Sequence, residues 1–284
     1  MLDLEAVRSY TVQRELAWEP RDVILYHLGL GAGSSPIDPG ELAYTYEPRL
    51  RVLPTFSVVP AFEAMMAFLY APELGFSPTT MLHAEHELIV SAPLPAAAAS
   101  RTDVAVADVL DKGSGALVVI DATTRDVRTG ATFCVNRFGV FVRGAGGFGG
   151  PQGGRAPAPP LAPPEHRVRR TTLPQQALLF RLSGDWNPLH VDPEVAQAAG
   201  FPRPILHGLC TYGIVFKAVV DVLLGGDAAR VTGFRARFCG PVFPGETLAI
   251  ELWRQRDGIA VAASVVERSA PVLSHGFVYQ AFGR

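Results

Sequence analysis

The sequence predicts an α+β fold in which one structural unit, a buried helix followed by antiparallel strands, is built twice. Three observations predict this organisation. Two sets of strand-like runs occur along the 284 residues, and an apolar segment with helical spacing precedes each set. Between the sets, residues 144–164 hold 13 Gly or Pro among 21 positions. Such a composition supports neither a helix nor a sheet and is typical of a partly extended linker.

The first half begins this pattern with the segment AFEAMMAFLY, which follows Pro60. Phe62, Met65, Met66 and Phe68 recur there at helical spacing and predict a helix with an apolar face. Strand-like runs rich in β-branched and aromatic residues follow at 83–94, 103–110, 115–124 and 131–142.

The second half repeats the pattern. The segment GLCTYGIVFKAVVDVLL, residues 208–224, is apolar on nearly every face, so the helix that it predicts must be buried. Strand-like runs follow at 231–238, 247–255, 259–267 and 272–282.

Each half therefore predicts one helix followed by a four-stranded antiparallel meander that curves around it, because a curved sheet of this kind buries an all-round apolar helix. This is the hot-dog architecture, and its repetition predicts a double hot-dog chain. The expected units are an N-terminal domain at 1–143, the Gly/Pro-rich linker at 144–164 and a C-terminal domain at 165–284. Two unrelated α+β domains are the alternative.

Composition excludes several classes of function. The chain has 25 Lys or Arg against 27 Asp or Glu, so no basic excess indicates a nucleic-acid partner. Its longest apolar runs fall far short of the roughly 20 residues of a membrane span, and its first residues lack a secretory signal. Cys134, Cys210 and Cys239 show no CxxC spacing, which favours reduced thiols in a cytoplasmic protein.

The stretch SGDWNPLHVDP, residues 183–193, concentrates the polar chemistry of the chain. Pro188 is incompatible with a regular helix here and Gly184 permits a tight turn, so we expect a shaped loop that aims Asp185 and His190 at one point. Asn187 lies between them and either orients the site or fixes the turn. Asp192 precedes Pro193, the pattern of a helix cap, so it is interpreted as structural.

Downstream, His207 and Gly208 open the predicted buried helix. A helix N-terminus offers free N–H groups, and a glycine there allows a ligand to approach the backbone closely. This predicts a backbone donor for a carbonyl oxygen that gains negative charge. His207 itself is interpreted as a brace for the loop.

Together these parts suit one reaction. A carboxylate and an imidazole can share a water molecule as base and acid, while the backbone donor polarises a conjugated carbonyl. That combination predicts addition of water across the double bond, or the reverse dehydration, without a cofactor. The histidines and Asp192 superficially suggest a metal cluster, but their spacing matches none of the usual ligand signatures, so no metal is expected.

The motif RLSGDWNPLHVDP followed by FPRPILHGLCTYG resembles the signature of the MaoC-like (R)-specific enoyl-CoA hydratases, also called enoyl-CoA hydratase 2, in their two-hot-dog form. The similarity extends in order over most of the chain, through RDVILYHLGLGAG, LRVLPTFSVV, VADVLDKGSG and RARFCGPVFPGET. The resemblance implies a homodimer that acts on acyl-CoA thioesters. It also implies that the first half has lost catalysis and makes room for the acyl chain.

Roles for single residues follow from the resemblance. Asp185 and His190 match the catalytic pair, Asn187 matches the orienting amide and Gly208 matches the donor to the thioester oxygen. Further residues match contacts to the CoA ester, namely His83, Lys112 and Phe238. The family usually has His-Gly where this chain has His83 and Ala84, a departure that would narrow the ligand groove or change which ester fits.

Arg235 and Arg237 alternate along a predicted strand and therefore share a face. They either pair with the CoA phosphates or solvate an edge.

The predicted function is reversible hydration of trans-2-enoyl-CoA to (R)-3-hydroxyacyl-CoA. Three alternatives stay open: a dehydratase that acts on carrier-protein thioesters, a hot-dog thioesterase, and a non-catalytic acyl-CoA-binding subunit. The SGDxNPLH segment argues against the last two, which do not need its acid–base pair.

Overall fold

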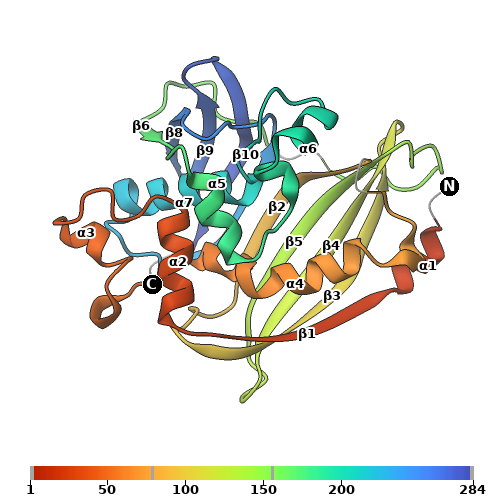
Figure 1. Ribbon diagram of the computed structural model, residues 1–284, viewed down its shortest axis with the longest axis horizontal. Coiled ribbons are helices and arrows are strands. Elements are labelled where there is room, and N and C mark those ends of the chain that lie inside the picture. The colour runs from red at the N-terminus through yellow and green to blue at the C-terminus, as the bar shows by residue number, and fades with distance from the viewer. Residues whose placement is uncertain (1–2, 78–79, 155–156, 282–284) are drawn as a thin grey trace.

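The central element of the computed structural model, which describes residues 3–77, 80–154 and 157–281, is one continuous antiparallel sheet. Its ten strands run in the order β1-β3-β4-β5-β2-β7-β10-β9-β8-β6 (Figure 1). The first five belong to the first half of the chain and the last five to the second half, and the two sets meet where β2 pairs with β7.

The first half contains strands β1 to β5 and helices α1 to α4. The helices are α1 (Leu4–Ser9), α2 (Pro20–Gly29), α3 (Pro39–Leu42) and α4 (Val58–Leu69). The strands are β1 (Thr11–Trp18), β2 (Met81–Val90), β3 (Ala98–Asp111), β4 (Gly115–Asp126) and β5 (Thr132–Arg143). Short 3-10 turns lie at Glu47–Arg49, Pro54–Ser57 and Pro72–Leu74.

The second half contains strands β6 to β10 and helices α5 to α7. The helices are α5 (Gln176–Phe180), α6 (Pro193–Ala198) and α7 (Gly208–Leu223). The strands are β6 (His166–Thr171), β7 (Val231–Phe238), β8 (Thr247–Gln255), β9 (Gly258–Val265) and β10 (Ala270–Gln280). Two 3-10 turns, Arg181–Ser183 and Pro188–His190, flank the polar loop.

The two long helices confirm the predicted hot-dog cores. Helix α4 packs on β1, β3 and β4, and Pro60 lies in its first turn, where a missing N–H costs no intrahelical bond. Helix α7 is buried along nearly its whole length, as its all-round apolar sequence predicts. Its Tyr212 packs on Phe234 of β7 at a ring distance of 4.2 Å and donates a hydrogen bond to that residue's carbonyl.

The predicted four-stranded meanders are wrong in two respects. Each of the eight predicted runs contains a strand, but some run past its end, as at 91–94 and 266–267, and residue 282 lies outside the described residues. Strands β1 and β6 were not predicted. These two strands form the edges of the sheet, and charged residues interrupt their apolar alternation, as is usual for edges. In addition, β2 does not pair with β3, which follows it in sequence, but with β5 and β7.

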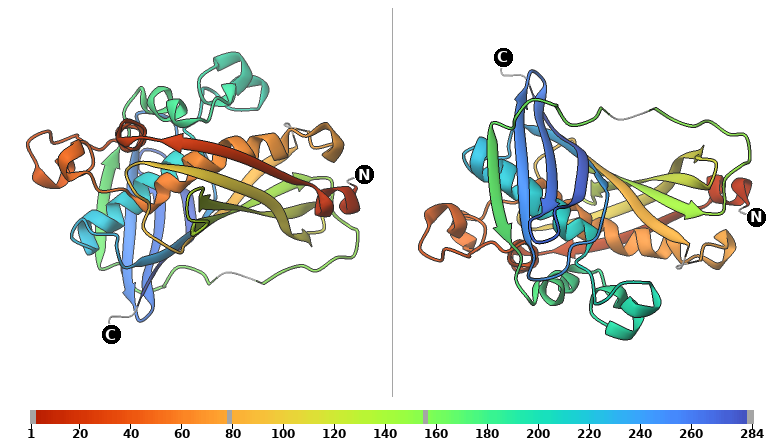
Figure 2. Two further views of the ribbon diagram at one scale, coloured as in Figure 1. Left: turned by 90° about the horizontal axis from the view of Figure 1, so that it is seen from below. Right: turned by 90° about the horizontal axis from the view of Figure 1, so that it is seen from above.

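The Gly/Pro-rich linker crosses from β5 to β6 along the outside of the sheet (Figure 2), and its described residues contain no helix or strand. The carboxylate of Asp111 accepts hydrogen bonds from the backbone N–H groups of Gly147 and Gly149 at 2.9 and 2.7 Å, which ties the linker to the end of β3. The division into domains at 1–143 and 165–284 stays a prediction, because the sheet runs unbroken across both.

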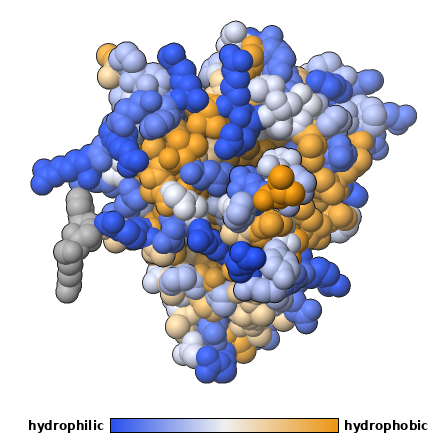
Figure 3. Space-filling view, turned by 90° about the vertical axis from the view of Figure 1, so that its left-hand side faces the viewer, coloured by the Kyte–Doolittle hydropathy of each residue, from blue (hydrophilic) through white to orange (hydrophobic). Residues whose placement is uncertain are grey.

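Apolar side chains appear among charged ones on the face at the left of Figure 1 (Figure 3). Exposed apolar side chains of the chain include Leu28 of α2 and Ile37 just before α3. A large apolar patch is typical of a protein–protein contact, and the homodimer stays a prediction. No helix in the described part of the chain is long and apolar enough to span a membrane.

An ion cluster around the buried Lys217 joins the two halves. Lys217 of α7 is 5% exposed, and its Nζ lies 2.8 Å from carboxylate oxygens of both Glu41 in α3 and Asp221. The ring of Tyr44 lies under this ammonium at 4.6 Å, and its hydroxyl donates to Asp221 at 3.0 Å. The cluster fixes the α3 segment of the first half on the central helix of the second.

Lys217→Met should lower the stability of the chain, because Glu41 would lose its cation at 2.8 Å and Asp221 would keep the more distant Arg170, at 3.7 Å. Breaking a buried pair in this way costs about 3–5 kcal/mol, which thermal unfolding would detect. Arg167→Met is the matched control: Arg167 forms an exposed pair with Glu251 at 3.1 Å, and exposed pairs contribute only about 0–1 kcal/mol. Equal losses in the two variants would contradict a special role for the cluster.

Candidate active site

The polar loop at residues 181–192 is folded by its own sequence. Gly184 adopts φ +116°, a left-handed conformation that favours glycine, and this turn reverses the chain after α5. Asn187 then caps the 3-10 turn that contains Pro188, because its Oδ1 accepts a hydrogen bond from the N–H of Leu189 at 3.0 Å. The loop is therefore rigidly shaped, and Asn187 has at least this structural role.

The loop brings the predicted catalytic pair together. A carboxylate oxygen of Asp185 and one ring nitrogen each of His190 and His207 lie within 4.8 Å of one another. The Nδ1 of His190 lies 2.9 Å from the carbonyl oxygen of Ile205. A carbonyl only accepts hydrogen bonds, so Nδ1 carries the proton and Nε2 of the neutral ring keeps its lone pair for chemistry.

Burial shifts the pKa of both Asp185 and His190. It raises the pKa of the Asp185 carboxyl above its ordinary value, while the neighbouring His190 opposes this shift. It lowers the pKa of the His190 imidazole below its ordinary value, and Asp185 opposes that shift in turn. Desolvation disfavours the charged form of each group. Near neutral pH the pair therefore consists of a carboxylate of raised basicity beside a neutral imidazole.

Asp192 and its helix behave as the sequence predicts. The Asp192 carboxylate accepts hydrogen bonds from the N–H groups of Glu194 and Val195 at the start of α6. Asp192 is thus a cap, and the two carboxylates of the loop have separate roles.

The predicted backbone donor lies next to the pair. Helix α7 begins at Gly208, directly after His207, so the N–H of Gly208 has no partner within the helix. A Cβ at Gly208 would approach the Phe238 ring to 3.4 Å, and the same ring packs on that of His83 at 4.9 Å. The structure therefore brings Gly208, Phe238 and His83 together at the N-terminus of α7.

His83 and Ala84 lie at a β-bulge of β2. The pairing of β2 with β5 shifts register between His83 and Glu85, so Ala84 is the extra residue and both His83 and His86 turn toward the interior. Their rings meet edge to face at 5.5 Å, and burial lowers the pKa of His83 to about 4. His83 is therefore a neutral group beside the α7 terminus.

The three cationic residues that were predicted to contact CoA make other contacts in this structure. Lys112 lies in the turn between β3 and β4 and donates a hydrogen bond to the carbonyl of Gln152 in the linker. Arg235 and Arg237 do share a face, but it is the outer face of the sheet, since the side chains of alternate residues on β7 face the core. Arg237 pairs there with Glu85 at 2.9 Å, and Arg235 lies over the ring of Tyr279 at 5.6 Å. Contact of the three with CoA phosphates stays a prediction.

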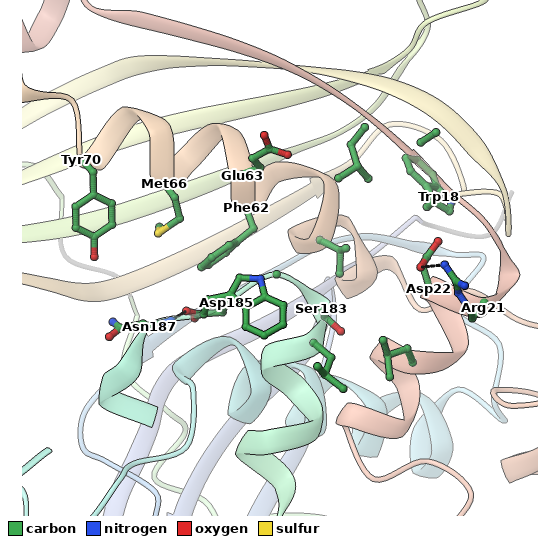
Figure 4. A pocket seen from close by; sticks show the side chains of 17 residues that line it. Trp18, Arg21, Asp22, Phe62, Glu63, Met66, Tyr70, Ser183, Asp185 and Asn187 are labelled. Carbon is green, nitrogen blue, oxygen red and sulfur yellow. Dashed lines mark hydrogen bonds and ion pairs between the residues drawn. The ribbon is translucent and has the colours of Figure 1, made fainter. Parts of the chain in front are cut away.

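A groove of about 770 Å³ opens beside the pair and was not predicted from the sequence. Its walls come from β1, α2 and α4 of the first half and from residues 182–187 of the loop (Figure 4). Apolar side chains dominate its lining: Leu16, Trp18, Leu25, Val59, Phe62 and Met66. The helical spacing of Phe62 and Met66 predicted the apolar face of a helix. It could not show that this face lines a groove as well as the core.

The prediction that no metal takes part is not tested by this geometry. Asp185, His190 and His207 are the one group within the described residues with the donor types and spacing of a metal site. In this group, Nδ1 of His190 and Nε2 of His207 already contact backbone carbonyls.

Both halves of the chain match families of known proteins. Residues 17–144 match the family described as the MFE-2 hydratase 2 N-terminal domain, and residues 155–274 match the MaoC like domain. Enoyl-CoA hydratase ChsH3 of Mycobacterium tuberculosis is 46% identical over 89% of this chain and 88% of its own length. A 3-hydroxyacyl-thioester dehydratase Y of the same organism is 43% identical, over 94% and 93%.

A solved structure supports the same relationship. The full-length peroxisomal multifunctional enzyme type 2 of Drosophila melanogaster superposes with a TM-score of 0.84 and 34% identity, covering 95% of this chain and 48% of that one. Both halves of the chain, their order and their fold therefore have matching relatives. The chain belongs to the enoyl-CoA hydratase 2 family of MaoC-like double hot-dog proteins.

Proposed function

We propose that the chain interconverts trans-2-enoyl-CoA and (R)-3-hydroxyacyl-CoA, as a hydro-lyase with one active site per chain. The observation that carries the proposal is the close approach of Asp185 and His190 beside the N-terminus of α7, with Asp185 lining an apolar groove. The (R) configuration is the one that the resemblance implies.

The proposed reaction uses one water molecule, held between the Asp185 carboxylate and Nε2 of His190. The pair accepts a proton from this water as its oxygen bonds to the β-carbon of the substrate, and a proton passes from the pair to the α-carbon. Electron density moves onto the thioester oxygen, where the N–H of Gly208 stabilises it. The elements of one water add across the double bond, so the step balances without a cofactor.

The groove is the proposed site for the acyl chain. It is formed mainly by the first half, which lacks an equivalent of the polar loop, and its volume lies in the range of small-molecule sites. The charged side chains of Arg21, Asp22 and Glu63 line it alongside the apolar residues.

Dehydration of a thioester is the same reaction in reverse, and one relative carries the name of a thioester dehydratase. The second candidate is therefore net dehydration of a 3-hydroxyacyl group carried by CoA or by a carrier protein. Comparing turnover of matched CoA and carrier-linked substrates in both directions would separate the two candidates.

Asp185→Asn should abolish most of the activity on trans-2-enoyl-CoA, because an amide cannot accept the proton from water. The expected loss is on the order of 10²–10⁴-fold, measured as disappearance of the conjugated thioester absorbance with a chelator present and no cofactor added. Burial of the ionised carboxyl destabilises the fold near neutral pH, so the melting temperature should not fall.

Asp192→Asn is the matched control for this substitution, because it makes the same chemical change in the same loop. Asparagine caps a helix about as well as aspartate, so activity and stability should both persist. A wild-type chain that leaves enoyl-CoA unchanged, or an Asp185→Asn variant as active as the wild type, would contradict the proposed function.

The pH dependence should reflect both shifted groups. Asp185 must be ionised, and its raised pKa means that protonation starts above the ordinary carboxyl value of 3.8. His190 must keep its lone pair, and its lowered pKa means that protonation starts only below 6.5. We therefore expect kcat/KM to fall on the acid side, with the loss from Asp185 centred above pH 3.8 and the loss from His190 centred below pH 6.5. An acid limb that reflects neither group, with its midpoint at or below pH 3.8, would contradict this assignment.

Met66→Trp should select against long acyl chains, because the indole would fill part of the groove. For long-chain enoyl-CoA we expect kcat/KM to fall ~10-fold or more, in line with the usual cost of a filled pocket, while a four-carbon substrate should be nearly unaffected. Val127→Trp introduces the same indole at an exposed turn and serves as control. Equal effects on both chain lengths would place the acyl group elsewhere.

A further inference from the structure

His207 makes contacts that reach both members of the catalytic pair. Its side chain is completely buried, and its Nε2 lies 3.2 Å from the backbone carbonyl oxygen of Asp185. Its ring also lies on that of His190, with 3.8 Å between centroids and 32° between planes. A residue that only capped α7 would need neither contact, and no hydrogen bond from its side chain caps the helix.

The contact with Asp185 determines which tautomer His207 adopts. The carbonyl can only accept, so Nε2 of His207 carries the proton and donates it. Nδ1 is then unprotonated, and it has no hydrogen-bond partner within the described residues. Burial lowers the pKa of His207 to about 2, and His190 and Arg181 lower it further by repulsion. His207 is therefore neutral throughout the working range and is not itself a proton carrier.

The position of His207 in the chain lets these contacts link Asp185 to the start of α7. It directly precedes Gly208, the proposed donor to the thioester oxygen. The hydrogen bond to Asp185 therefore links the base to the residue beside the oxyanion donor, across 22 positions of sequence. A fixed separation of these groups matters because small displacements of reacting groups reduce rates steeply.

The stacked ring has a second effect on His190. It covers one face of the imidazole and keeps water away, which adds to the desolvation that disfavours the imidazolium form. The other charged groups that act on this cluster are Asp185, which favours a protonated His190, and Arg181, which acts on Asp185 and His207.

We propose that His207 is the positioning residue of the catalytic pair: its Nε2–H holds the Asp185 backbone, and its ring keeps His190 dry and neutral. The inference rests on the proposed function, because it concerns the same site and assumes that Asp185 and His190 carry out the reaction. It assigns His207 two separable contributions, one made by the N–H donor and one made by the ring.

Two variants separate these contributions. His207→Phe keeps a ring over His190 but removes the donor, so kcat should fall on the order of 10²-fold with little change in KM or in the acid limb. His207→Gln keeps an N–H at similar reach but removes the ring. It should lose less in kcat, while the acid limb moves up toward pH 6.5 because water reaches His190 and raises its pKa.

His27→Phe supplies the control for a merely structural histidine. His27 is fully buried in α2 and joins the carbonyl of Tyr44 to the N–H of Leu53, and its ring contacts are with Tyr26 and Tyr44. We expect this variant to lower the melting temperature without moving the pH profile.

Titration of the His190 ring by ¹H–¹⁵N NMR tests the inference independently of turnover. The wild type should show the Nδ1–H tautomer and a pKa below 6.5 at His190, and His207→Gln should raise that pKa even if the hydratase assignment fails. The inference is overturned if the glutamine variant leaves the pKa of His190 unmoved. It is also overturned if His207→Phe equals the wild type in kcat, or if both variants lose only stability, as the His27 control does.

Discussion

The antiparallel pairing of β2 with β7 is the interaction on which the rest of the molecule depends. It joins two five-stranded sheets into one and places the helices of both halves on one face. Leu88 of β2 lies opposite Asn136 of β5 and opposite Phe234 of β7, so these side chains share a face. Ser57, at the start of α4, bonds to Asn136 on that face, and Tyr212 of α7 packs on Phe234. The polar loop then has α4 of the other half as its wall, where Gly184 lies against Phe62.

Desolvation follows from this arrangement and explains the electrostatics of the site. The same enclosure raises the pKa of Asp185 and lowers that of His190. In water the carboxylate would be a weak base and the imidazole would be partly protonated. In this site the carboxylate is a stronger base and the imidazole is neutral. The first half thus contributes to the proposed chemistry without supplying a proton carrier, because it excludes water and shapes the groove. The same logic explains why His207, permanently neutral, can pack on His190 without competing for its proton.

The sequence predicted the parts of this structure that depend on local signals. The helices at α4 and α7, eight of the strands, the Asp192 cap and the pairing of Asp185 with His190 all follow from spacing, turns and caps within short windows. The edge strands β1 and β6 were not predicted, because charged residues such as Arg14 and Arg169 interrupt the apolar alternation of their sequences. Strand order, the groove and the outward direction of Arg237 depend on contacts between distant segments. No short window encodes them, and the family resemblance supplied roles for residues but not these geometries.

The mirrored strand order has a consequence for how such a chain can change over time. The order β1-β3-β4-β5-β2 is repeated in reverse as β7-β10-β9-β8-β6, so the two halves are related by an approximate two-fold axis between β2 and β7. In a pair of identical single hot-dog subunits, every substitution occurs twice, and a residue that enlarges one cavity damages its symmetry mate. Covalent fusion removes that coupling. One half can keep the SGDxNPLH chemistry while the other is free to accumulate bulkier or roomier side chains, so ligand preference can diversify without a matching loss of turnover.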